Sequence, residues 1–492
     1  MSTIDFEIAK KAALNYKPPF VLSSGDEALD RLFNTLPNQV ESSRFYGRCG
    51  YYQTGGAIGF RDQLQDCLCE MFVNKSAVRD LILNCAKHQY EQGDVQHWWH
   101  EPKLGVRTKI TDDRLFLPFI TAIYVKFSGD YSILHEKIEY LSSPILENKS
   151  RYENPVWTDY KETLLNHIEK AVNSALNFGE NGLLKIGGGD WNDALDEVGS
   201  DEKGESVWLT EFMVLTLEEI KDFYNGNSRI EILNLISKLK SAVEKTYANE
   251  RYARLVTKDG EWLGVKGGKI EIDAISQAFA SLIGLDKERV KCALNSALSL
   301  FDEEYKIVKL LSPPISEKGY GYISDYPLGV RENGGQYTHG AVWLALGFLN
   351  SNDAETAYKI LSALNPLSRC TDKKLNDAYM GEPYVLAGDV YTNSDNFGRM
   401  GWSWYTGSAA WYFVSVLKMF GIELRENTLL IKPCLPKALY DAKLTFEHND
   451  SMIKITYVQS SEFKIKLNGT VYEGVEGLKI IPDRVYNIEV FC

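Results

Sequence analysis

Apolar residues recur at helical spacing through most of the chain. From about residue 60 to about residue 425, stretches such as DYKETLLNHIEKAVNSALNF and SVWLTEFMVLTLEEIKDFYN alternate with loops rich in glycine, asparagine or proline. The pattern predicts about a dozen helices. Many of them are apolar on more than one side, which is typical of two concentric helical layers rather than a simple bundle.

The two ends of the chain have a different texture. Residues 1–45 read as a helical lead-in, because EALDRLFNTL spaces its apolar residues as a helix does. Beyond residue 425, short segments alternate apolar and polar residues between turn signals, and LNGT is a candidate hairpin. The sequence thus predicts a mainly α fold, with a helical domain over 46–425 and a small, sandwich-like β module over 426–492.

Composition narrows the class of protein. The chain has 492 residues, a net charge of −13 and 8 cysteines. This charge argues against a nucleic-acid or anionic-membrane surface. No apolar stretch is long enough to span a membrane, the N-terminus lacks the apolar core of a signal peptide, and the cysteines are too sparse for a disulfide scaffold. We therefore expect a cytoplasmic protein that binds neither nucleic acid nor membrane.

Aromatic residues suggest what the protein binds. The chain contains 10 Trp and 28 Tyr, and several lie in loops among Asp, Asn, Gln, His and Gly. Aromatic residues usually fill cores. In polar loops, however, rings can stack on the C–H faces of sugars while neighbouring polar groups take the hydroxyls, so these loops point to a carbohydrate site.

Two early loops carry charged residues. In GFRDQLQD, Arg61 and Asp62 stand where a glycine-rich loop enters a helix. They suit phosphate or sugar oxygens, or else form a structural ion pair at the helix start. The next loop, GDVQHWWHEPKLGVRTKITDD, holds His97, Trp98 and Asp113. Its H-x-x-H spacing lacks the context of a zinc motif, and its paired aspartates read equally as helix caps.

The stretch GGGDWNDALD is the candidate catalytic loop. Its glycines allow a sharp turn and close approach to a ligand. Asp193 follows Trp191 by two residues, so in an extended backbone both side chains would face the same way. A carboxyl beside an indole would have a raised pKa and stay protonated, as a general acid requires. The alternative is an Asx turn that caps the next helix.

Two later loops look like anion sites. In GVRENGGQYTHGAVW, His339 stands near Arg331 and Gln336 at the approach to an apolar helix. In GWSWYTGSAAW, Thr406 and Gly407 open another helix, whose free N–H groups favour an anion. Simple N-capping is the alternative for this second loop.

In order along residues 40–440, these motifs resemble the inverting β-glycoside phosphorylases of glycoside hydrolase family 94. YYQTGGAIGFRDQLQD, GDVQHWWH, GVRTKITDD, IGGGDWNDALD, GESVWL, RENGGQYTHGAVW, EPYVLAGDVYT and GWSWYTGSAAW carry the resemblance. It implies an (α/α)6 barrel whose active site lies at the loop-rich mouth. It also implies phosphorolysis of a β-glucoside to α-glucose 1-phosphate and a shortened sugar, with inorganic phosphate as a substrate and without a metal or organic cofactor.

The resemblance also assigns roles to residues. Asp193 matches the general acid, and Arg331 stands where a basic residue touches the acceptor sugar. The groups expected to bind the sugar are Asp62, Trp191, Gln336, Trp98 and Asp113, and those expected to bind phosphate are Arg61, His339, Thr406 and Gly407. An anion pocket would take the place of the base carboxylate that inverting hydrolases need.

Two departures from the family refine these expectations. Gly56 replaces an arginine found in cellobiose- and chitobiose-type members. This favours the branch of oligoglucan phosphorylases and cyclic glucan synthases, and hence a β-1,2-glucan. The chain also begins almost at the lead-in helix, without the β-sandwich that precedes the barrel in the family. We therefore expect a homodimer or a partner subunit that supplies a sandwich.

Two other functions stay open. An inverting glycoside hydrolase or transglycosylase would need a base carboxylate, for which Glu332, Glu382 and Asp389 are candidates. A non-catalytic oligosaccharide-binding module would bind sugar without turnover. Dependence on inorganic phosphate separates the phosphorylase from both.

Overall fold

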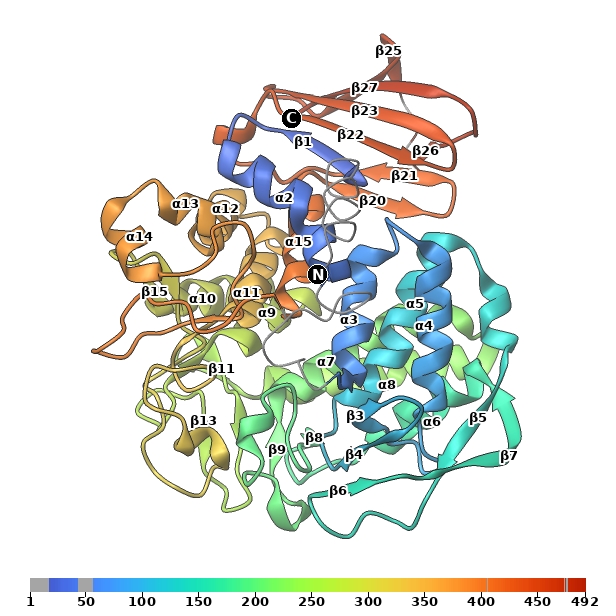
Figure 1. Cartoon of the computed structure of the whole chain (residues 1–492), viewed down its shortest axis with the longest axis vertical. Coiled ribbons are helices and arrows are strands. Elements are labelled where there is room, and N and C mark those ends of the chain that lie inside the picture. Colours follow the sequence, from blue (N-terminus) through green and yellow to red (C-terminus); the bar gives the residue numbers. More distant parts are fainter. Residues whose placement is uncertain (1–16, 43–55, 405, 473, 475–476) are drawn as a thin grey trace, which may run out of the picture.

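The computed structural model describes residues 17–42, 56–404, 406–472, 474 and 477–492, and Figure 1 shows their arrangement. Helices fill the lower part of the view, and a β module lies above them. The mainly helical fold expected from the sequence is confirmed. Along the described residues, no helix combines the length and the apolar character needed to cross a membrane.

Among the described residues, six helices contact one another in cyclic order. The ring consists of α3 (Phe60–Glu70), α5 (Phe116–Ser128), α7 (Val207–Ile220), α9 (Ala274–Leu282), α11 (Thr338–Asn350) and α15 (Ser408–Met419), which contacts α3 again. These helices are buried on nearly all sides: in α11, every residue from Thr338 to Leu349 is buried. Such all-round burial explains why their sequences are apolar on more than one side.

A second set of helices covers the ring from outside. In the described part of the chain these are α2 (Glu27–Val40), α4 (Lys75–Lys87), α6 (Leu164–Ala175), α8 (Gly226–Glu244), α10 (Lys287–Ala297) and α12 (Ala354–Leu364). Each packs on a ring helix, and α2 contacts both α15 and α3. On α8, only Ile236, Leu239, Ala242 and Val243 are buried. The outer layer is therefore amphipathic, as expected for helices with one face toward solvent.

The β module contains two antiparallel-rich sheets. The larger has the order β1–β22–β23–β27–β24–β25, and the smaller has the order β20–β21–β26. Their strands are β1 (Phe20–Ser23), β20 (Ile422–Arg425), β21 (Thr428–Ile431), β22 (Lys443–His448), β23 (Ser451–Val458), β24 (Lys464–Leu467), β25 (Thr470–Tyr472), β26 (Leu478–Lys479) and β27 (Val485–Phe491). The predicted LNGT hairpin is confirmed, because Leu467 pairs with Thr470 across Asn468 and Gly469.

The lead-in departs from the purely helical segment predicted for residues 1–45. Strand β1 pairs with β22, placing Phe20 opposite Phe446, and helix α2 belongs to the outer layer. Figure 1 shows β1, in blue, beside the red strands of the β module. The module also begins at β20, before residue 426. Periodicity alone did not reveal this, because a four-residue strand is too short to give a clear pattern and its pairing partner lies more than 400 residues away.

Phe20 joins the β module to the helices. Its ring centroid lies 4.6 Å from that of Phe446 and 5.7 Å from that of Phe413 on α15, and it also contacts Phe33 of α2 and Phe72. The ring is 2% exposed. Offset and edge-on aromatic pairs of this kind add stability beyond the burial of their surface.

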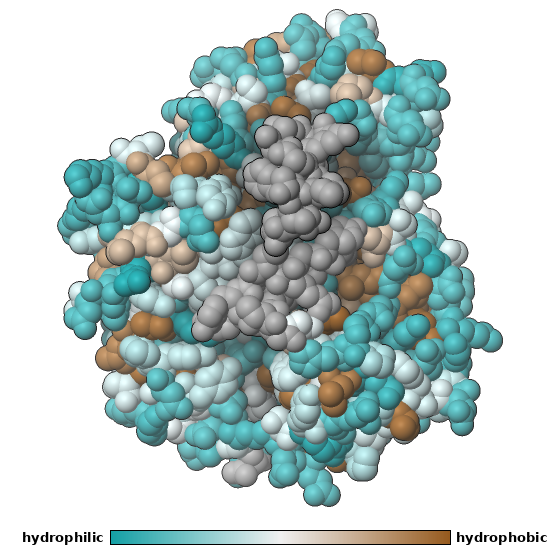
Figure 2. Space-filling model, viewed as in Figure 1, coloured by the Kyte–Doolittle hydropathy of each residue, from teal (hydrophilic) through white to brown (hydrophobic). Residues whose placement is uncertain are grey.

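Shorter strands frame one end of the ring. Strands β2 (Ile58–Gly59), β3 (Gln96–His100), β4 (Leu104–Thr108) and β6 (Ser150–Glu153) form one small sheet, and β8 (Leu184–Lys185) and β9 (Glu205–Ser206) belong to another. β2 leads directly into α3, β9 into α7, and β18 (Gln336–Tyr337) into α11. On the face in Figure 2, hydrophobic residues lie in separate small groups among hydrophilic ones.

We expect Phe20→Ala to lower the free energy of unfolding by about 3–5 kcal/mol, because it removes a buried ring from several aromatic contacts. Val21 on the same strand is 49% exposed, so Val21→Ala is the matched control, with an expected change of about 0.5 kcal/mol or less. Urea unfolding of both variants measures the difference. Equal losses for the two would contradict this role of Phe20.

Candidate functional site

The loops that enter the ring helices meet at one end of the ring. Ring and outer helices alternate along the chain, so successive ring helices run in the same direction. Arg61 and Asp62 lie in the first turn of α3, His339 lies in the first turn of α11, and Gly407 is the N-cap residue of α15. Helix N-termini expose backbone N–H groups and carry partial positive charge, so this end of the ring favours anions.

Arg61 lies at the centre of a carboxylate cluster. Its Nη1 donates to Asp112 Oδ1 at 2.8 Å and Oδ2 at 2.9 Å, and its Nη2 donates to Asp193 Oδ1 at 2.6 Å. Its Nε lies 3.5 Å from Asp113 Oδ1. Each guanidinium nitrogen therefore faces a carboxylate already. In this structure Arg61 positions Asp193, and it does not present the open fork expected of a phosphate ligand.

The paired aspartates do not cap a helix with their side chains, which was the alternative interpretation. They open the short 3-10 helix η3 (Asp113–Leu115), and Asp112, its N-cap residue, makes no side-chain capping bond. Both carboxylates turn toward Arg61. Burial, opposed by the charge of Arg61, raises the pKa of Asp112, and the neighbouring carboxylates add to the increase.

His97 completes the cluster; the sequence analysis named it in this loop without assigning it a role. Its Nδ1 lies 2.8 Å from Asp113 Oδ2, and its Nε2 lies 3.5 Å from Asp193 Oδ2. The pairing of β3 with β4 shifts register between Gln96 and Trp98, so His97 occupies an irregularity in the strand. A bulge commonly re-aims a side chain beside an active site. The sequence of β3 alone does not reveal this irregularity, because a bulge is defined by the pairing with the neighbouring strand β4.

The expected raised pKa of Asp193 is wrong. Burial raises its pKa, but the charges of Arg61 and His97 outweigh burial and hold the pKa at about 2. Asp193 opens the 3-10 helix η5 (Asp193–Leu195), while Trp191 is 6% exposed and points toward His339. The expectation failed because the two cations come from α3 and β3, which no local reading of the loop includes.

A second ion pair fixes the loop that carries Asp193. Arg254 donates to both carboxylate oxygens of Asp190 at 2.7 Å, and Ser206 Oγ donates to Asp190 Oδ2 at 2.7 Å. Arg254 and Asp190 are both fully buried. Gly187 has φ +64°, and a Cβ there would lie 2.6 Å from the carbonyl oxygen of Lys109. The glycines therefore allow the close approach that the sequence suggested, here to the protein's own backbone.

Trp191 and His339 form one unit. Trp191 Nε1 donates to His339 Nδ1 at 3.3 Å, and the two rings meet edge-on with centroids 5.3 Å apart. With Nδ1 as acceptor, the neutral imidazole carries its proton on Nε2. His339 also packs on Trp343, with centroids 4.2 Å apart. Trp191 thus orients His339, a link that sequence distance concealed.

Thr406 and Gly407 open α15, as the sequence predicted. Thr406 Oγ1 accepts a hydrogen bond from the backbone N–H of Ser408 at 3.2 Å. The N-cap residue is Gly407 and no side chain caps the helix, so the alternative of N-capping by Thr or Ser is wrong. Helices α15 and α11 contact each other, and Trp411 of α15 lies with its centroid 6.3 Å from that of His339. The three candidate phosphate groups other than Arg61 therefore belong to neighbouring helix entrances, and their binding role stays a prediction.

The candidate sugar-binding residues divide into two kinds. Asp62 and Trp98 are half-buried near the cluster, on α3 and β3. Gln336 is 1% exposed, and its amide accepts from the backbone N–H of Val308 at 3.1 Å and donates to Thr338 Oγ1. Asp113 is also 1% exposed and faces Arg61 and His97. Gln336 and Asp113 are therefore buried and already bonded to protein groups, so they hold neighbouring residues in place.

Arg331 has an unusual backbone for its residue type, with φ +53°. Its Cζ lies 4.9 Å from the ring centroid of Trp402 and 5.1 Å from that of Tyr326. Its backbone N–H donates to Asp389 Oδ2 at 3.1 Å. A strained residue held by surrounding contacts is typical of a functional site.

The three candidate base carboxylates, Glu332, Asp389 and Glu382, differ in their surroundings. Burial raises the pKa of Glu332; Arg331 opposes that rise, and the charge of Asp193 adds to it. Burial raises the pKa of Asp389 to about 7. Glu382 accepts from Ser403 Oγ at 2.8 Å. Of the three, Glu332 is the carboxylate whose pKa the charge of Asp193 raises. Glu332 is therefore the candidate base for the hydrolase alternative.

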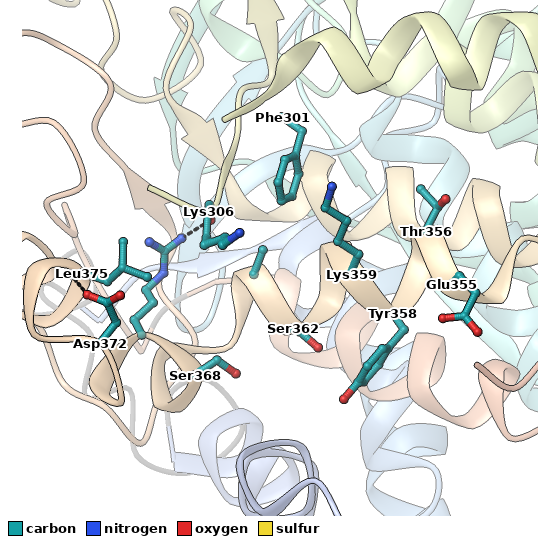
Figure 3. A pocket seen from close by; sticks show the side chains of 12 residues that line it. Phe301, Lys306, Glu355, Thr356, Tyr358, Lys359, Ser362, Ser368, Asp372 and Leu375 are labelled. Carbon is teal, nitrogen blue, oxygen red and sulfur yellow. Dashed lines mark hydrogen bonds between the residues drawn. The ribbon is translucent and has the colours of Figure 1, made fainter. Parts of the chain in front are cut away.

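A large hollow lies away from this cluster. A cavity of about 710 Å³ is lined by residues of α12 and of the segments before and after it, including Lys306, Tyr358 and Asp372. Figure 3 shows the side chains that line it. Arg369 beside it donates to the carbonyl oxygens of Tyr305 and Lys306 at 2.7 and 2.6 Å. None of the sequence-predicted site residues lines this cavity. Its position on the outer layer separates it from the candidate site.

Solved structures share the fold. The chain superposes on the GH78 family rhamnosidase of Bacillus sp. GL1 with TM-score 0.56 at 12% identity, covering 96% of this chain and 44% of that one. A rhamnosidase from Klebsiella oxytoca gives TM-score 0.51 at 11% identity, covering 83% and 66%. At these identities the superpositions show a shared fold and nothing about activity.

Residues 17–421 match the model of the glycosyl hydrolase 94 superfamily, catalytic domain. The match covers most of the chain, so the chain belongs to this family, and the resemblance in its motifs is confirmed.

Curated relatives agree with this assignment. The chain is 37% identical over 476 residues to the cyclic beta-(1,2)-glucan synthase NdvB of Rhizobium meliloti, covering 91% of this chain and 17% of that protein. It is 29% identical to the solabiose phosphorylase of Paenibacillus borealis, covering 77% and 48%. It is 24% identical to the 1,2-beta-oligoglucan phosphorylase of Listeria innocua, covering 85% and 41%. The chain thus spans less than half the length of each.

We expect the stability advantage of wild type over Asp193→Asn to shrink at acid pH. The folded pKa of about 2 lies below the usual 3.8, so the ionised group contributes stability that is present above pH 3.8 and lost as pH falls toward 2. By pH 3 the loss amounts to about 1 kcal/mol.

Urea unfolding of both proteins between pH 6 and pH 3 measures this difference. Glu197→Gln on the same loop, where the side chain is 46% exposed, serves as the control and should show no comparable trend. A constant difference between wild type and Asp193→Asn across this range would contradict the low pKa.

Proposed function

We propose that the chain catalyses inverting phosphorolysis of a β-linked glucoside or oligoglucan, giving α-glucose 1-phosphate and a shortened sugar, and the reverse synthesis. The observation that carries the proposal is the cluster in which Asp193 lies between Arg61 and His97. Beside it, His339, Thr406 and Gly407 stand at two neighbouring helix entrances of the ring. Family membership supports the reaction class.

The (α/α)6 barrel is part of the proposal. The cyclic contacts of α3, α5, α7, α9, α11 and α15, each covered by an outer helix, support it. This geometry directs all the entrances of the ring helices to one end, so their partial positive charges add at a single place. A phosphate dianion bound there needs no second carboxylate to activate it.

In the proposed mechanism, Asp193 protonates the glycosidic oxygen while a phosphate oxygen attacks C1 from the opposite face of the sugar. The electron pair of the C1–O bond leaves with the acceptor oxygen. Trp191 holds His339 so that Nε2–H is its donor, which suits a phosphate oxygen. Asp62 and Trp98 would contact the glucosyl unit, and Arg331, stacked between two rings, would meet the acceptor.

The names of two relatives and one residue support a particular linkage. Two of the relatives are named for β-1,2-glucans, and Gly56 fits that branch. We therefore propose a β-1,2-linked oligoglucan as substrate, inorganic phosphate as the co-substrate, no metal or organic cofactor, and a cytoplasmic location. A homodimer or a partner subunit that contributes to the acceptor side is also part of the proposal.

The hydrolase alternative rests on Glu332, which lies close enough to Asp193 for the charge of Asp193 to affect its pKa. A hydrolase would release glucose without phosphate, and Glu332→Gln would abolish that release. A phosphorylase releases glucose 1-phosphate only when phosphate is present. Product analysis with and without phosphate separates the two.

The proposed function is tested by incubating the chain with α-glucose 1-phosphate and a panel of glucose-containing acceptors. We expect release of inorganic phosphate with β-1,2-linked acceptors. Asp193→Asn should lower kcat by about 100-fold or more, because it removes the general acid, and Glu197→Gln should leave kcat unchanged. Activity that survives Asp193→Asn would overturn the assignment of the acid.

His339→Asn should raise the KM for phosphate by about 10- to 100-fold, since a hydrogen bond to a charged group contributes about 1.5–3 kcal/mol. The KM for the sugar should change much less. His135→Asn, on a separate short helix, is the control. Steady-state kinetics with phosphate varied at fixed sugar measures the effect, and an unchanged phosphate KM would show that His339 has another role.

A further inference from the structure

The proposed function leaves one chemical problem. A general acid must carry a proton, yet the structure holds Asp193 as a carboxylate. Arg61 donates to its Oδ1 at 2.6 Å, and a guanidinium does not give up its proton in proteins. The contacts that place the acid correctly therefore also oppose its protonation.

We propose that His97 stores the proton that Asp193 delivers to the leaving sugar, with Asp113 holding the imidazole in place. The proposal rests on the proposed function, because it explains how the same reaction obtains its acid. Its basis is geometric: the two nitrogens of His97 face two different carboxylates, Asp113 at 2.8 Å and Asp193 at 3.5 Å.

Facing two carboxylates requires two N–H groups. A neutral imidazole has one N–H and one acceptor nitrogen, so it can satisfy only one carboxylate, whereas an imidazolium satisfies both. Although burial lowers the pKa of His97, the charges of Asp113 and Asp193 outweigh burial and raise that pKa well above its usual value. The geometry and this pKa shift both favour the imidazolium form of His97.

The surroundings of the pair are charged on several sides. Asp113 and Asp193 face His97 directly, while Arg61 and Asp112 lie on the far side of these carboxylates. Tyr322 lies near the proposed acid. Burial raises the pKa of its phenol and the charge of Asp193 adds to the rise, so the phenol stays neutral. Arg61 keeps a permanent charge beside Asp193, and Asp112, whose pKa burial raises, faces Arg61 rather than Asp193. His97 is the titrating group that faces Asp193 directly.

Substrate binding would move the proton. The Asp193 side chain is 26% exposed, and a sugar bound against it would shield it from solvent. A drier site favours a neutral acid and a neutral imidazole over an ion pair. The Nε2 proton of His97 then passes to Asp193 Oδ2.

The proton balance closes over one turnover. Asp193 gives the proton to the glycosidic oxygen as the C1–O bond breaks and a phosphate oxygen bonds to C1. The proton carried by phosphate leaves to solvent, and solvent returns one proton to His97. No oxidant, reductant or further reactant takes part.

The test uses His97→Gln, whose amide donates a hydrogen bond but cannot store a proton. We expect kcat for phosphorolysis at pH 7 to fall by about 100-fold. We also expect the alkaline limb of the pH profile to move toward acid by about one pH unit or more, because the low pKa of Asp193 then acts alone. His100→Gln on the same strand is the control and should change neither.

A structural role alone would lower kcat and leave the pH limb in place, and that result would overturn the proposal. Should His97→Gln fail to fold, Asp113→Asn keeps the imidazole but removes its anchor. The alkaline limb should then move in the same direction, and an unmoved limb would again overturn the proposal.

A second measurement does not depend on activity. ¹⁵N-histidine labelling follows the protonation of the 7 histidines of the chain, with His97→Gln identifying the signal. His97 should be protonated at pH 7 in wild type. In Asp113→Asn the pKa of His97 should be lower, so that titration toward alkaline pH removes its proton earlier. A neutral His97 at pH 7 would overturn the proposal that His97 stores the proton. If His97 is protonated but the chain shows no phosphate-dependent turnover, only the proposed function is overturned.

Discussion

The site depends on one buried guanidinium that three carboxylates share. Arg61 ties α3 to Asp112 and Asp113 before α5 and to Asp193 in the glycine-rich loop. Burying these charges is costly in isolation, so the arrangement persists only where the backbone is held rigidly. The Asp190–Arg254 pair provides that rigidity on the side of the catalytic loop.

This arrangement separates positioning from protonation. A carboxylate that accepts a hydrogen bond from Arg61 is held in a fixed orientation but remains ionised. A general acid of this kind needs a neighbouring group, with a pKa nearer to neutrality, to supply its proton. Because Arg61 is committed to carboxylates, the proposed mechanism places anion binding at the helix entrances and at His339. The proposed acid and the proposed anion site then lie on opposite sides of the loop 190–193, next to Asp193 and next to Trp191.

The fold makes such a site possible because the ring helices are buried on nearly all sides. Their side chains pack against each other and against the outer layer, and the loops at the helix entrances carry most of the candidate site residues. Strand β1 and helix α2 show that the first described residues belong to this same body: one extends the β module, and the other covers α15 and α3. Phe20 connects the two parts.

The sequence by itself determined the mainly helical class, the change to β structure near residue 425, the LNGT hairpin and the motifs that identify the family. These follow from periodicity and from local residue types, which a single stretch of chain carries. Only the tertiary structure decided that Arg61 binds carboxylates, that His97 reaches Asp193, that Trp191 orients His339, and that β1 joins a distant sheet. The physical reason is that each of these depends on a partner 50 to more than 400 residues away, and the electrostatic field of such partners reverses the pKa shift that the local loop predicts.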